Sequence, residues 1–444
     1  MRKYLGVRKL KRYRQIINIL IKYGFGIILQ RVHIIKFPKR KKIEISIPER
    51  IRKILEELGP TFIKLGQILS TRPDLIPIEY IKELEKLQDN VKEEDFNIME
   101  NLIEEEFGKP IEEIFDQFQP IPIASASLSC VYKGKYKGKD VAIKVQRPNV
   151  KQQILTDIQI LYDIAALIER FIKESEIYQP IKIVREFEKS IKKELNFLIE
   201  ARNFEIVREK MKDEEKVFVP YVFKELCSEK IIVTEFIEGV KISEVEVWSE
   251  YVNKEEILKT GTNIILKQIF DIGVFHGDPH PGNIFILKDG KIAMLDFGIV
   301  GYLDEEKKYH LINLFSGLIK GRTEKVIFTL KHMNSIDKST NVDELKEDIE
   351  ELFETYKDIP IKRIKIGELI GASFEIMRKN KIKIPISFSL IGKSIITLEG
   401  ICHFIEPDFK LIESIEPYLI DLLDKKLKFT YFFKKIENTF DRFS

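Results

Sequence analysis

The stretch HGDPHPGNIFILKDGKIAMLDFG, from His276 to Gly298, decides how this chain is interpreted. Asp278 is followed five residues later by Asn283, and thirteen residues further on by the triplet Asp-Phe-Gly that begins at Asp296. The segments NIFIL and IAMLD predict two short β-strands joined by a turn at the Lys-Asp-Gly between them. Acidic and amide side chains are therefore expected on loops beside a strand pair.

Such a set of side chains suits phosphoryl transfer. That reaction needs metal ions on the phosphates, a positive charge near them and a group that orients the nucleophile. Asp and Asn supply the hard oxygen ligands that Mg²⁺ prefers. We predict that Asn283 and Asp296 hold the metal and that Asp278 orients or deprotonates the nucleophile. Upstream, VAIK ends at Lys144 on an expected strand, where its ammonium would meet the α- and β-phosphates of ATP.

The same stretch allows two other interpretations. Asp278 and Asn283 would serve only as turn caps if the neighbouring prolines alone shape the loop. His276 and His280 have the spacing of a metal pair on a helix, but the prolines make this segment a loop. We interpret both histidines as loop-ordering groups, with metal binding as the minor alternative.

No glycine-rich loop precedes the expected strands; the sequence there reads PIPIASASLSCVYKG. Small residues allow close backbone approach but do not favour positive φ as glycine does, so a stiffer loop is expected. Serine hydroxyls would add hydrogen bonds to phosphate, although an ordinary surface turn is the alternative. We assign nucleotide binding to this loop, to Lys144, and to residues in and after two later elements: Ala124, Ser125, Ala126, Ser127, Glu200, Glu235 and Ile237.

The composition suits a soluble globular protein. Of the 444 residues, 44% are hydrophobic and 33% are charged. The three cysteines lie far apart without metal-ligand spacing, which predicts reduced thiols in a cytoplasmic protein. The pattern of elements divides the chain into a basic amphipathic arm, a helical extension, a small lobe with strands and a larger helical lobe, at 1–45, 46–119, 120–238 and 239–444.

The arm concentrates positive charge. Residues 1–42 hold 14 of the 74 Lys and Arg and no acid, which leaves 60 basic against 71 acidic residues elsewhere, a net charge of −11. Its apolar part, Ile16 to Leu29, runs only 14 residues, short of the roughly 20 that a spanning helix needs. Interleaved aliphatic, aromatic and basic residues favour a helix in the membrane interface. A helix packed on the protein body is the alternative, and nucleic acid is not an expected partner.

Taken together, these motifs resemble the UbiB/ADCK (AarF) family of atypical kinases. The resemblance rests on the alanine-rich loop, VAIKVQRP, LKQIFDIGVFHGDPHPGN, LDFGIVG and FIKLGQILSTRPDLIPIEYIKELEKLQDNV, and extends to about residue 409. It implies a kinase-like fold that binds ATP with Mg²⁺ and lies peripherally on an anionic or isoprenoid lipid surface. It also implies a supporting role in isoprenoid-quinone or related lipid metabolism, beside quinone-biosynthesis enzymes.

The hallmark Lys-x-Gly-Gln of that family stands here as Lys64, Gly66 and Gln67. In the family, this helix sits over the site where a peptide substrate would dock. Lys64 and Gln67 are three residues apart and so face the same way on a helix. Gly66 allows close packing against another element. We assign Lys64 to catalysis with Lys144 and Asp278, and the glycine and glutamine to structure or regulation; a surface helix with a solvated lysine is the alternative.

The segment KKELNFLIEARN resembles the acidic helix of the family, with Asn196 where Asp is usual. On a continuous helix over 181–211, Glu194 and Glu200 would point in different directions, which fits one partner each. We pair Glu200 with Lys144 and leave Glu194 for the helix of Lys64. Ser129-Cys130 is a second departure, where Gly-Gln or Ala-Gln is usual.

The sequence therefore predicts an α+β, bilobal protein-kinase-like fold with an N-terminal helical extension that carries Lys-x-Gly-Gln. The expected activity is ATP hydrolysis or phosphorylation of a small molecule at a membrane surface. The end of the chain, LDKKLKFTYFFKKIENTFDRFS, is too charged to span a membrane, so no transmembrane segment is expected. Two alternatives remain: a nucleotide-sensing scaffold for lipid-pathway enzymes without significant phosphotransfer, and a conventional protein kinase.

Overall fold

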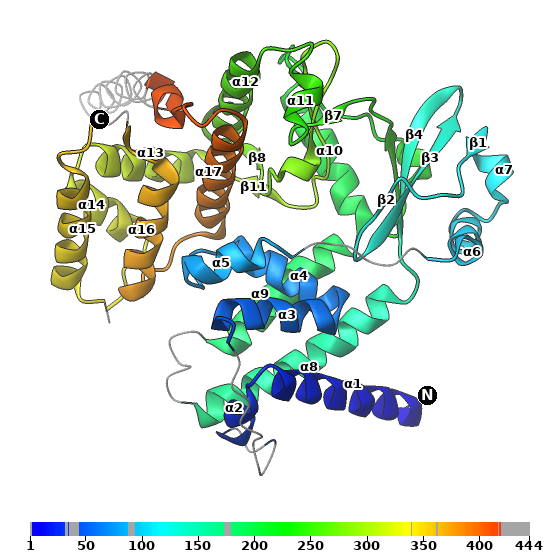
Figure 1. Cartoon of the computed structure of the whole chain (residues 1–444), viewed down its shortest axis with the longest axis horizontal. Helices are drawn as coiled ribbons and strands as arrows, with labels where there is room; N and C mark the ends of the chain where they lie inside the picture. Colours follow the sequence, from blue (N-terminus) through cyan, green and yellow to red (C-terminus); the bar gives the residue numbers. More distant parts are fainter. Residues whose placement is uncertain are drawn as a thin grey trace, which may run out of the picture. The chain divides into compact units, whose positions relative to one another are not determined.

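The computed structural model describes residues 2–31, 34, 44–87, 94–172, 179–338, 340–360, 363–415 and 417–418. The chain forms two compact units (Figure 1). Unit 1 comprises Met1–Glu209, Val219–Glu238 and Asp296–Ile299, and unit 2 comprises Lys210–Phe218, Gly239–Leu295 and Val300–Ser444. Asp296 therefore belongs to unit 1, whereas Asp278 and Asn283 belong to unit 2.

The sheet of unit 1 carries Lys144. Its strands pair antiparallel in the order β1-β3-β4-β6, with β2 on β3. Their bounds are Gln117–Phe118 (β1), Ala124–Ser125 (β2), Ser129–Tyr136 (β3), Lys139–Gln146 (β4) and Ile231–Glu235 (β6). β3 and β4 join at Lys137 and Gly138, with φ of 49° and 76°, which confirms the expected hairpin with a glycine turn. Lys144 lies on β4 between Val131 of β3 and Ile232 of β6.

The described residues of 46–119 form five helices, in line with the helical pattern expected there. They are α3 (Ile47–Leu58), α4 (Pro60–Ser70), α5 (Ile78–Leu84), α6 (Phe96–Phe107) and α7 (Ile111–Ile114). The hydroxyl of Ser46 caps α3 by accepting from the Glu49 N–H, and Gly59 ends it with φ 89°. Pro60 then starts α4, because proline suits the first helical position. The Lys-x-Gly-Gln motif thus lies on a helix with sharp boundaries.

One helix expected over 181–211 is instead two. α9 (Pro180–Glu194) ends at Glu194, and α10 (Phe197–Lys210) begins after a break at Leu195 and Asn196. The side chain of Asn196 accepts a hydrogen bond from the Leu198 N–H at 3.1 Å, as a residue before a helix does. The argument from one continuous helix was therefore wrong, and the directions of Glu194 and Glu200 come from two separate helices.

The arm is not free of the protein body. α1 (Arg2–Lys22) packs on α3 and on α8 (Val150–Phe171), while α2 (Gly26–Arg31) follows it. Ile16 and Ile19 are buried, 2% and 6% exposed, in a core shared with these helices. Arg12 donates to both oxygens of buried Asp157, at 2.8 and 2.9 Å. The packing expected by the packed-helix alternative is therefore observed for α1; residues 32–33 and 35–43 lie outside the described ones.

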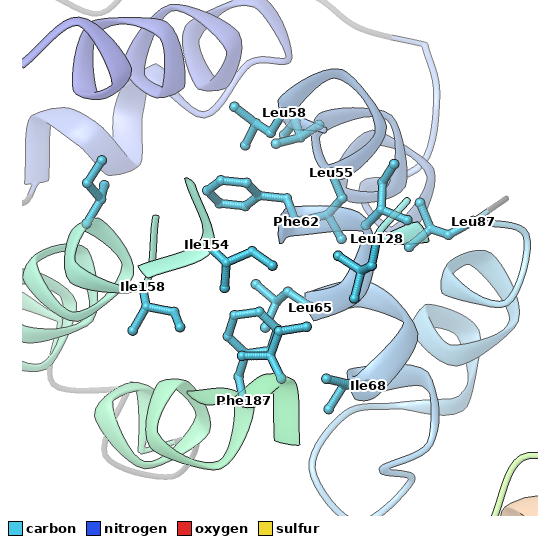
Figure 2. Packing of buried hydrophobic residues seen from close by; sticks show 14 of the residues in the cluster. Leu55, Leu58, Phe62, Leu65, Ile68, Leu87, Leu128, Ile154, Ile158 and Phe187 are labelled. Carbon is cyan, nitrogen blue, oxygen red and sulfur yellow. The ribbon is translucent and has the colours of Figure 1, made fainter. Parts of the chain in front are cut away.

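The core of unit 1 joins the extension to α8 and α9. Figure 2 shows part of it, where leucines and phenylalanine of α3 and α4 meet side chains from the segment after α5, the loop before β3, α8 and α9. The members from outside the extension helices are Leu87, Leu128, Ile154, Ile158 and Phe187. Leu128 belongs to the loop before β3, so this core reaches the segment expected to bind nucleotide.

Unit 2 is mostly helical, with two small sheets. Its strands pair as β5-β10-β9-β7 and as β11-β8, and their bounds are Val217–Phe218 (β5), Val240–Lys241 (β7), Val274–His276 (β8), Ile284–Ile286 (β9), Ile292–Met294 (β10) and Val300–Tyr302 (β11). β9 and β10 confirm the expected strand pair. The segment VFVPYVF is only partly a strand, because β5 ends at Phe218 and Val222 makes an isolated bridge to Thr234 in unit 1.

The helices of unit 2 follow one another in space. They are α11 (Val245–Trp248), α12 (Lys254–Lys267), α13 (Glu305–Ile319), α14 (Thr323–His332), α15 (Val342–Tyr356), α16 (Ile366–Lys379) and α17 (Ile386–Ile405). A π-turn, η3 (Gln268–Ile272), extends α12 toward β8. Consecutive helices from α13 to α17 pack pairwise (Figure 1). Glu399 of α17 caps α16 by accepting from the N–H groups of Ile366 and Gly367, both at 2.8 Å.

α17 is the one described helix long and apolar enough to cross a membrane, and 67% of its apolar window is buried inside the protein. Buried core helices have the same composition as spanning ones. Leu390, Ile391 and Ile395 of α17 belong to the buried interior. The charged C-terminal segment from residue 419 onward lies outside the described residues.

Candidate active site

A buried ion pair holds Lys144 in unit 1. The ammonium donates to both oxygens of Glu200, at 2.8 and 2.9 Å. It also lies 3.5 Å from Oδ2 of Asp296 and over the ring of Phe197 at 5.3 Å. Glu200 comes from α10 and its side chain is only 8% exposed, whereas that of Asp296 is 46% exposed. The predicted pairing of Glu200 with Lys144 is confirmed. Lys144, Glu200 and Asp296 are called the triad below, and Asp296 is its most solvent-exposed member.

The charges of this triad perturb each other. Burial by itself opposes the charge of Lys144, but the carboxylates of Asp296 and Glu200 outweigh it and raise the pKa of the ammonium. Burial raises the pKa of Glu200, and the cation of Lys144 opposes that shift only in part. Lys144 is therefore a permanent cation at physiological pH, as contact with phosphates requires. Glu200 is protonated more easily than an exposed carboxyl would be.

Asp296 owes its position to a local turn and to α10. Its φ is 61°, and its Oδ1 accepts from the Gly298 N–H at 3.0 Å. Aspartate tolerates this left-handed conformation because its short side chain bonds to the local backbone. Phe297 is fully buried against Phe204, with ring centroids 4.8 Å apart, and its carbonyl accepts from Asn203 Nδ2 at 2.8 Å. Both partners lie on the helix that carries Glu200, so α10 orients two members of the triad.

Lys64 occupies the same electrostatic neighbourhood. Its ammonium lies 3.2 Å from Oε2 of Glu194, and both side chains are largely buried, at 19% and 13% exposed. The positive charge of Lys64 lowers the pKa of Lys144 slightly, whereas the carboxylates of Asp296 and Glu200 raise it by more. The two acids thus take one lysine each, as predicted, and the alternative of a solvated Lys64 is excluded.

Gly66 and Gln67 serve the packing of α4. A Cβ on Gly66 would lie 2.2 Å from Leu87 Cδ1 and 2.9 Å from Leu55 Cδ1, so the expected close packing is confirmed. Gln67 Nε2 approaches the carbonyl of Leu87 at 3.5 Å. Gln67 thus contacts the segment after α5, and Lys64 contacts α9. The two contacts hold α4 to two different parts of unit 1.

The loop that replaces a glycine-rich loop is closed. Ala124 and Ser125 form β2 against β3, and the Ala126 N–H donates to the Ser129 carbonyl at 2.8 Å. Ser127 is fully buried, and its hydroxyl has no hydrogen-bond partner in the described part of the chain. Close packing of small residues replaces the flexibility of glycine here. The departure at Ser129-Cys130 puts both side chains into the interior, at 3% and 0% exposed.

Two other predicted nucleotide contacts lie at the end of β6. The N–H of Glu235 donates to the Tyr221 carbonyl at 2.8 Å, and its carboxylate faces the Tyr221 N–H at 3.3 Å. Ile237, two residues beyond the paired strand, is half-buried. The backbone and side chain of Glu235 thus both bond to Tyr221, and the predicted nucleotide contacts of Glu235 and Ile237 stay predictions.

In unit 2, His276 organises the loop that carries Asp278. Its ring Nδ1 accepts from the Asp278 N–H at 3.2 Å, so the other ring nitrogen carries the proton and donates to the Leu295 carbonyl at 3.3 Å. His280 Nδ1 accepts from the Gly282 N–H at 3.1 Å. The interpretation of both histidines as loop-ordering groups is confirmed. The Leu295 N–H donates to the Asn283 carbonyl at 2.9 Å, which ties that loop to β10.

Sequence reasoning missed several residues that hold these groups. Gln268, on η3, accepts from the His276 N–H at 3.1 Å, and Ser394 of α17 donates to the His276 carbonyl at 3.1 Å. Asn203 and Arg147 hold the Asp-Phe-Gly segment and the closed loop of unit 1. A buried polar residue in an apolar stretch is the signal that could have flagged them, because burial of such groups requires partners. In the described part of the chain, no three His, Cys, Asp or Glu side chains cluster as a metal site.

Comparison with known proteins places the chain in a family. Residues 86–330 match the model of the ABC1 atypical kinase-like domain, and residues 349–410 match that of the UbiB helical domain. The chain belongs to the ABC1/UbiB family of atypical kinase-like proteins. The UbiB helical match covers most of α15, α16 and α17.

Two relatives of this ABC1/UbiB chain show how far the likeness extends. The chain is 37% identical over 410 residues to a protein in the hydrogenase 1 5′ region of Clostridium pasteurianum, covering 92% of this chain and 76% of that one. It is 35% identical over 373 residues to the chloroplastic protein Activity of bc1 complex kinase 1 of Arabidopsis thaliana, covering 83% of this chain and 55% of that one.

A solved structure agrees on the fold. Rv3197 of Mycobacterium tuberculosis, determined as a complex with erythromycin, superposes with a TM-score of 0.52 at 21% identity, over 82% of this chain and 93% of that one. The mixed α+β fold is therefore kinase-like, as expected from the sequence. A kinase-like domain implies nucleotide binding in general.

Proposed function

We propose that this protein binds ATP with Mg²⁺ and hydrolyses it or transfers its γ-phosphoryl group to a small-molecule acceptor. The observation that supports this most is the triad of unit 1. Lys144 is held by buried Glu200 beside a half-exposed Asp296, which is the arrangement that positions a cation for the α- and β-phosphates. In this proposal the loop around Asp278, ordered by His276, would supply the remaining polar groups.

The residues divide the chemistry between them. Asp296, the most exposed acid of the triad, would act with Asn283 as a hard oxygen ligand for Mg²⁺. The metal would neutralise charge on the β- and γ-phosphates. Asp278 has its backbone fixed by His276 and would orient or deprotonate the attacking hydroxyl or water. Lys64 adds a second cation near Lys144, already balanced by Glu194.

Two aspartate variants test this division of roles. Asp296→Asn should weaken binding of Mg-ATP, because a charged metal ligand is lost. Asp278→Asn should spare binding and lower turnover, by about 100-fold or more. Asp289→Asn is the matched control, since Asp289 lies in the turn between β9 and β10, where it pairs with Lys291. Isothermal titration and ATP turnover measure the two effects, and an equal loss of binding in both site variants would reject the assignment.

We further propose that the activity takes place at a membrane surface, in isoprenoid-quinone or related lipid metabolism. The first 42 residues carry 14 basic and no acidic side chains, and the packed α1 and α2 still expose Leu10 and Ile27, at 54% and 47%. Each Lys or Arg near an anionic surface contributes about 1 kcal/mol. ATP turnover should rise with anionic liposomes or isoprenoid-headgroup compounds, and should not respond to neutral liposomes.

Two competing functions give different results in the same assay. A nucleotide-sensing scaffold would bind ATP with no turnover above the Asp278→Asn level, under any lipid condition. A conventional protein kinase would label a general protein substrate strongly. The buried ion pair between Lys64 and Glu194 favours a regulated ATPase or small-molecule kinase over the latter, because it fixes the extension helix beside the triad.

A further inference from the structure

A single arginine holds the closed loop of unit 1. Arg147 follows β4 and is only 5% exposed. Its Nε donates to the Ala126 carbonyl at 2.8 Å, its Nη2 to the Ser125 hydroxyl at 2.7 Å, and its Nη1 to Glu94 Oε1 at 2.7 Å. Hydrogen bonds from a charged donor contribute more than neutral ones. The guanidinium therefore connects the loop, the end of β4 and the segment that leads into α6.

The backbone of Arg147 also holds the loop, at the open end of the β3–β4 hairpin. Its N–H donates to the Leu128 carbonyl at 2.8 Å. The Leu128 side chain, 5% exposed, enters the core that contains Phe62 and Leu65 of α4 (Figure 2). The loop is thus attached to the helical extension twice, through an ion pair at Glu94 and through an apolar contact with the helix of Lys-x-Gly-Gln.

The two serine hydroxyls of the loop face inward. That of Ser125 accepts from Arg147 and lies 3.8 Å from the sulfur of Cys130. That of Ser127 is fully buried. In this conformation a phosphate would meet the backbone of the loop rather than its hydroxyls; whether the serines bind phosphate stays a prediction. The backbone conformation of the loop would then set its affinity for a nucleotide, and so would the side chains that hold that conformation.

We propose that Arg147 is a positioning residue for the nucleotide. It holds the backbone of residues 124–128 in the closed form, and through Glu94 and Leu128 it makes that form depend on the helical extension. A loop held in its binding shape loses less conformational entropy when the ligand arrives. This inference rests on the proposed ATP site and adds the residue that sets the affinity of its loop.

Graded variants of Arg147 test the proposal. Arg147→Lys keeps one charge for Glu94, but its single ammonium cannot reach the three acceptors that three separate guanidinium nitrogens contact. Arg147→Met removes all three of these side-chain hydrogen bonds. Loss of charge-assisted hydrogen bonds should speed amide exchange in residues 120–130 by about tenfold or more in Arg147→Met, with Arg147→Lys between it and the wild type. The KM for ATP should rise in the same order, by about tenfold at most, while kcat changes less than the KM.

Two further variants control for trivial effects. Arg12→Met removes another largely buried arginine of unit 1, which pairs with Asp157, and should lower the melting temperature without changing loop exchange or KM. Ser125→Ala should resemble a mild Arg147→Lys; a larger rise in KM than that of Arg147→Met would mean that the hydroxyl binds phosphate, and would overturn the proposal.

The outcomes separate this inference from the proposed function. Unchanged loop exchange in Arg147→Met, or an equal change in Arg12→Met, overturns the role of Arg147 even if the wild type binds ATP. Faster loop exchange in a protein that binds no ATP confirms that Arg147 holds the loop but overturns its role toward the nucleotide, together with the proposed function. If Arg147→Met fails to fold, the ranking of wild type, Ser125→Ala and Arg147→Lys carries the test.

Discussion

Gly66→Ala is the sharpest test of how α4 is held. An added Cβ would lie 2.2 Å from Leu87 Cδ1, 2.9 Å from Leu55 Cδ1 and 3.3 Å from Leu84 Cδ2. All three leucines are buried, at 5%, 8% and 2% exposed, so none can swing into solvent. Leu87 must retreat by more than an ångström to reach ordinary contact distance. Either the leucines repack or α4 shifts.

The magnitude follows from two opposing effects. Overpacking a core by one methyl costs about 1–3 kcal/mol, and two contacts below 3 Å place this substitution in the upper half of that range. Alanine in a helix interior gains about 1 kcal/mol over glycine. The net effect is a destabilisation of about 1–2 kcal/mol. Because α4 also carries Lys64, its ion pair with Glu194 at 3.2 Å should be weakened as well.

Peptide-resolved hydrogen exchange is the appropriate assay, because two units need not unfold together. Amides of α4 should exchange roughly tenfold faster in Gly66→Ala, since 1.4 kcal/mol corresponds to tenfold. Gly371 of α16 is the matched control: a Cβ there has nothing within 4 Å. Gly371→Ala should therefore slow exchange in α16, by the helix-propensity gain alone. If Gly66→Ala stabilises α4 as Gly371→Ala stabilises α16, the packing argument is wrong.

Three further predictions concern charge and burial. Burial raises the pKa of Glu200, so the ATP affinity of the wild type should begin to fall at a higher pH than protonation of an ordinary carboxyl would cause. Glu200→Gln should lower ATP affinity and make it depend less on pH. An equally steep pH profile in the variant would contradict this. Burial lowers the pKa of Lys393 to about 8 from 10.5, so the folded protein loses a proton there that the unfolded chain keeps. Stability should then rise between pH 8 and 10.5 by up to about 3 kcal/mol relative to Lys393→Met, measured by urea unfolding of both proteins across that window; parallel curves would refute it. Ile16→Ala should destabilise the packing of α1 by about 2–5 kcal/mol because Ile16 is 2% exposed. Leu10→Ala, at an exposed position, should reduce only flotation on anionic liposomes. If Leu10→Ala destabilised the packing and Ile16→Ala reduced only flotation, the buried and lipid-facing sides of α1 would have been assigned the wrong way round.

Much of the site was predictable because the signals are local. A turn at Lys137-Gly138 and apolar alternation around it predict the hairpin that carries Lys144, since both depend on residues a few positions apart. The ordered motifs from Lys64 to Asp296 pointed to the triad, and the resemblance to the UbiB/ADCK family supported the pairing of Lys144 with Glu200. These predictions concern which groups are present and which elements hold them.

Other features needed the folded chain. The break at Leu195 and Asn196 has one local signal, because asparagine favours the position before a helix. KKELNFLIEARN has no glycine or proline to end the preceding helix, so the sequence alone did not locate the break. Arg147 and Glu94 are 53 positions apart in the sequence and come together only in the folded chain. The motif VAIKVQRP contains Arg147, but no sequence pattern records such a long-range pair, so the motif does not show that this residue holds the loop closed.

The N-terminal helix shows the limit most directly. Its sequence determined that α1 is an amphipathic helix rich in basic residues, because periodicity and charge are properties of the chain itself. An apolar stripe gains nearly the same free energy against a membrane as against a protein core, since both remove it from water. Only the tertiary structure decided which surface that stripe covers. It buries Ile16 against neighbouring helices and pairs Arg12 with the buried carboxylate of Asp157.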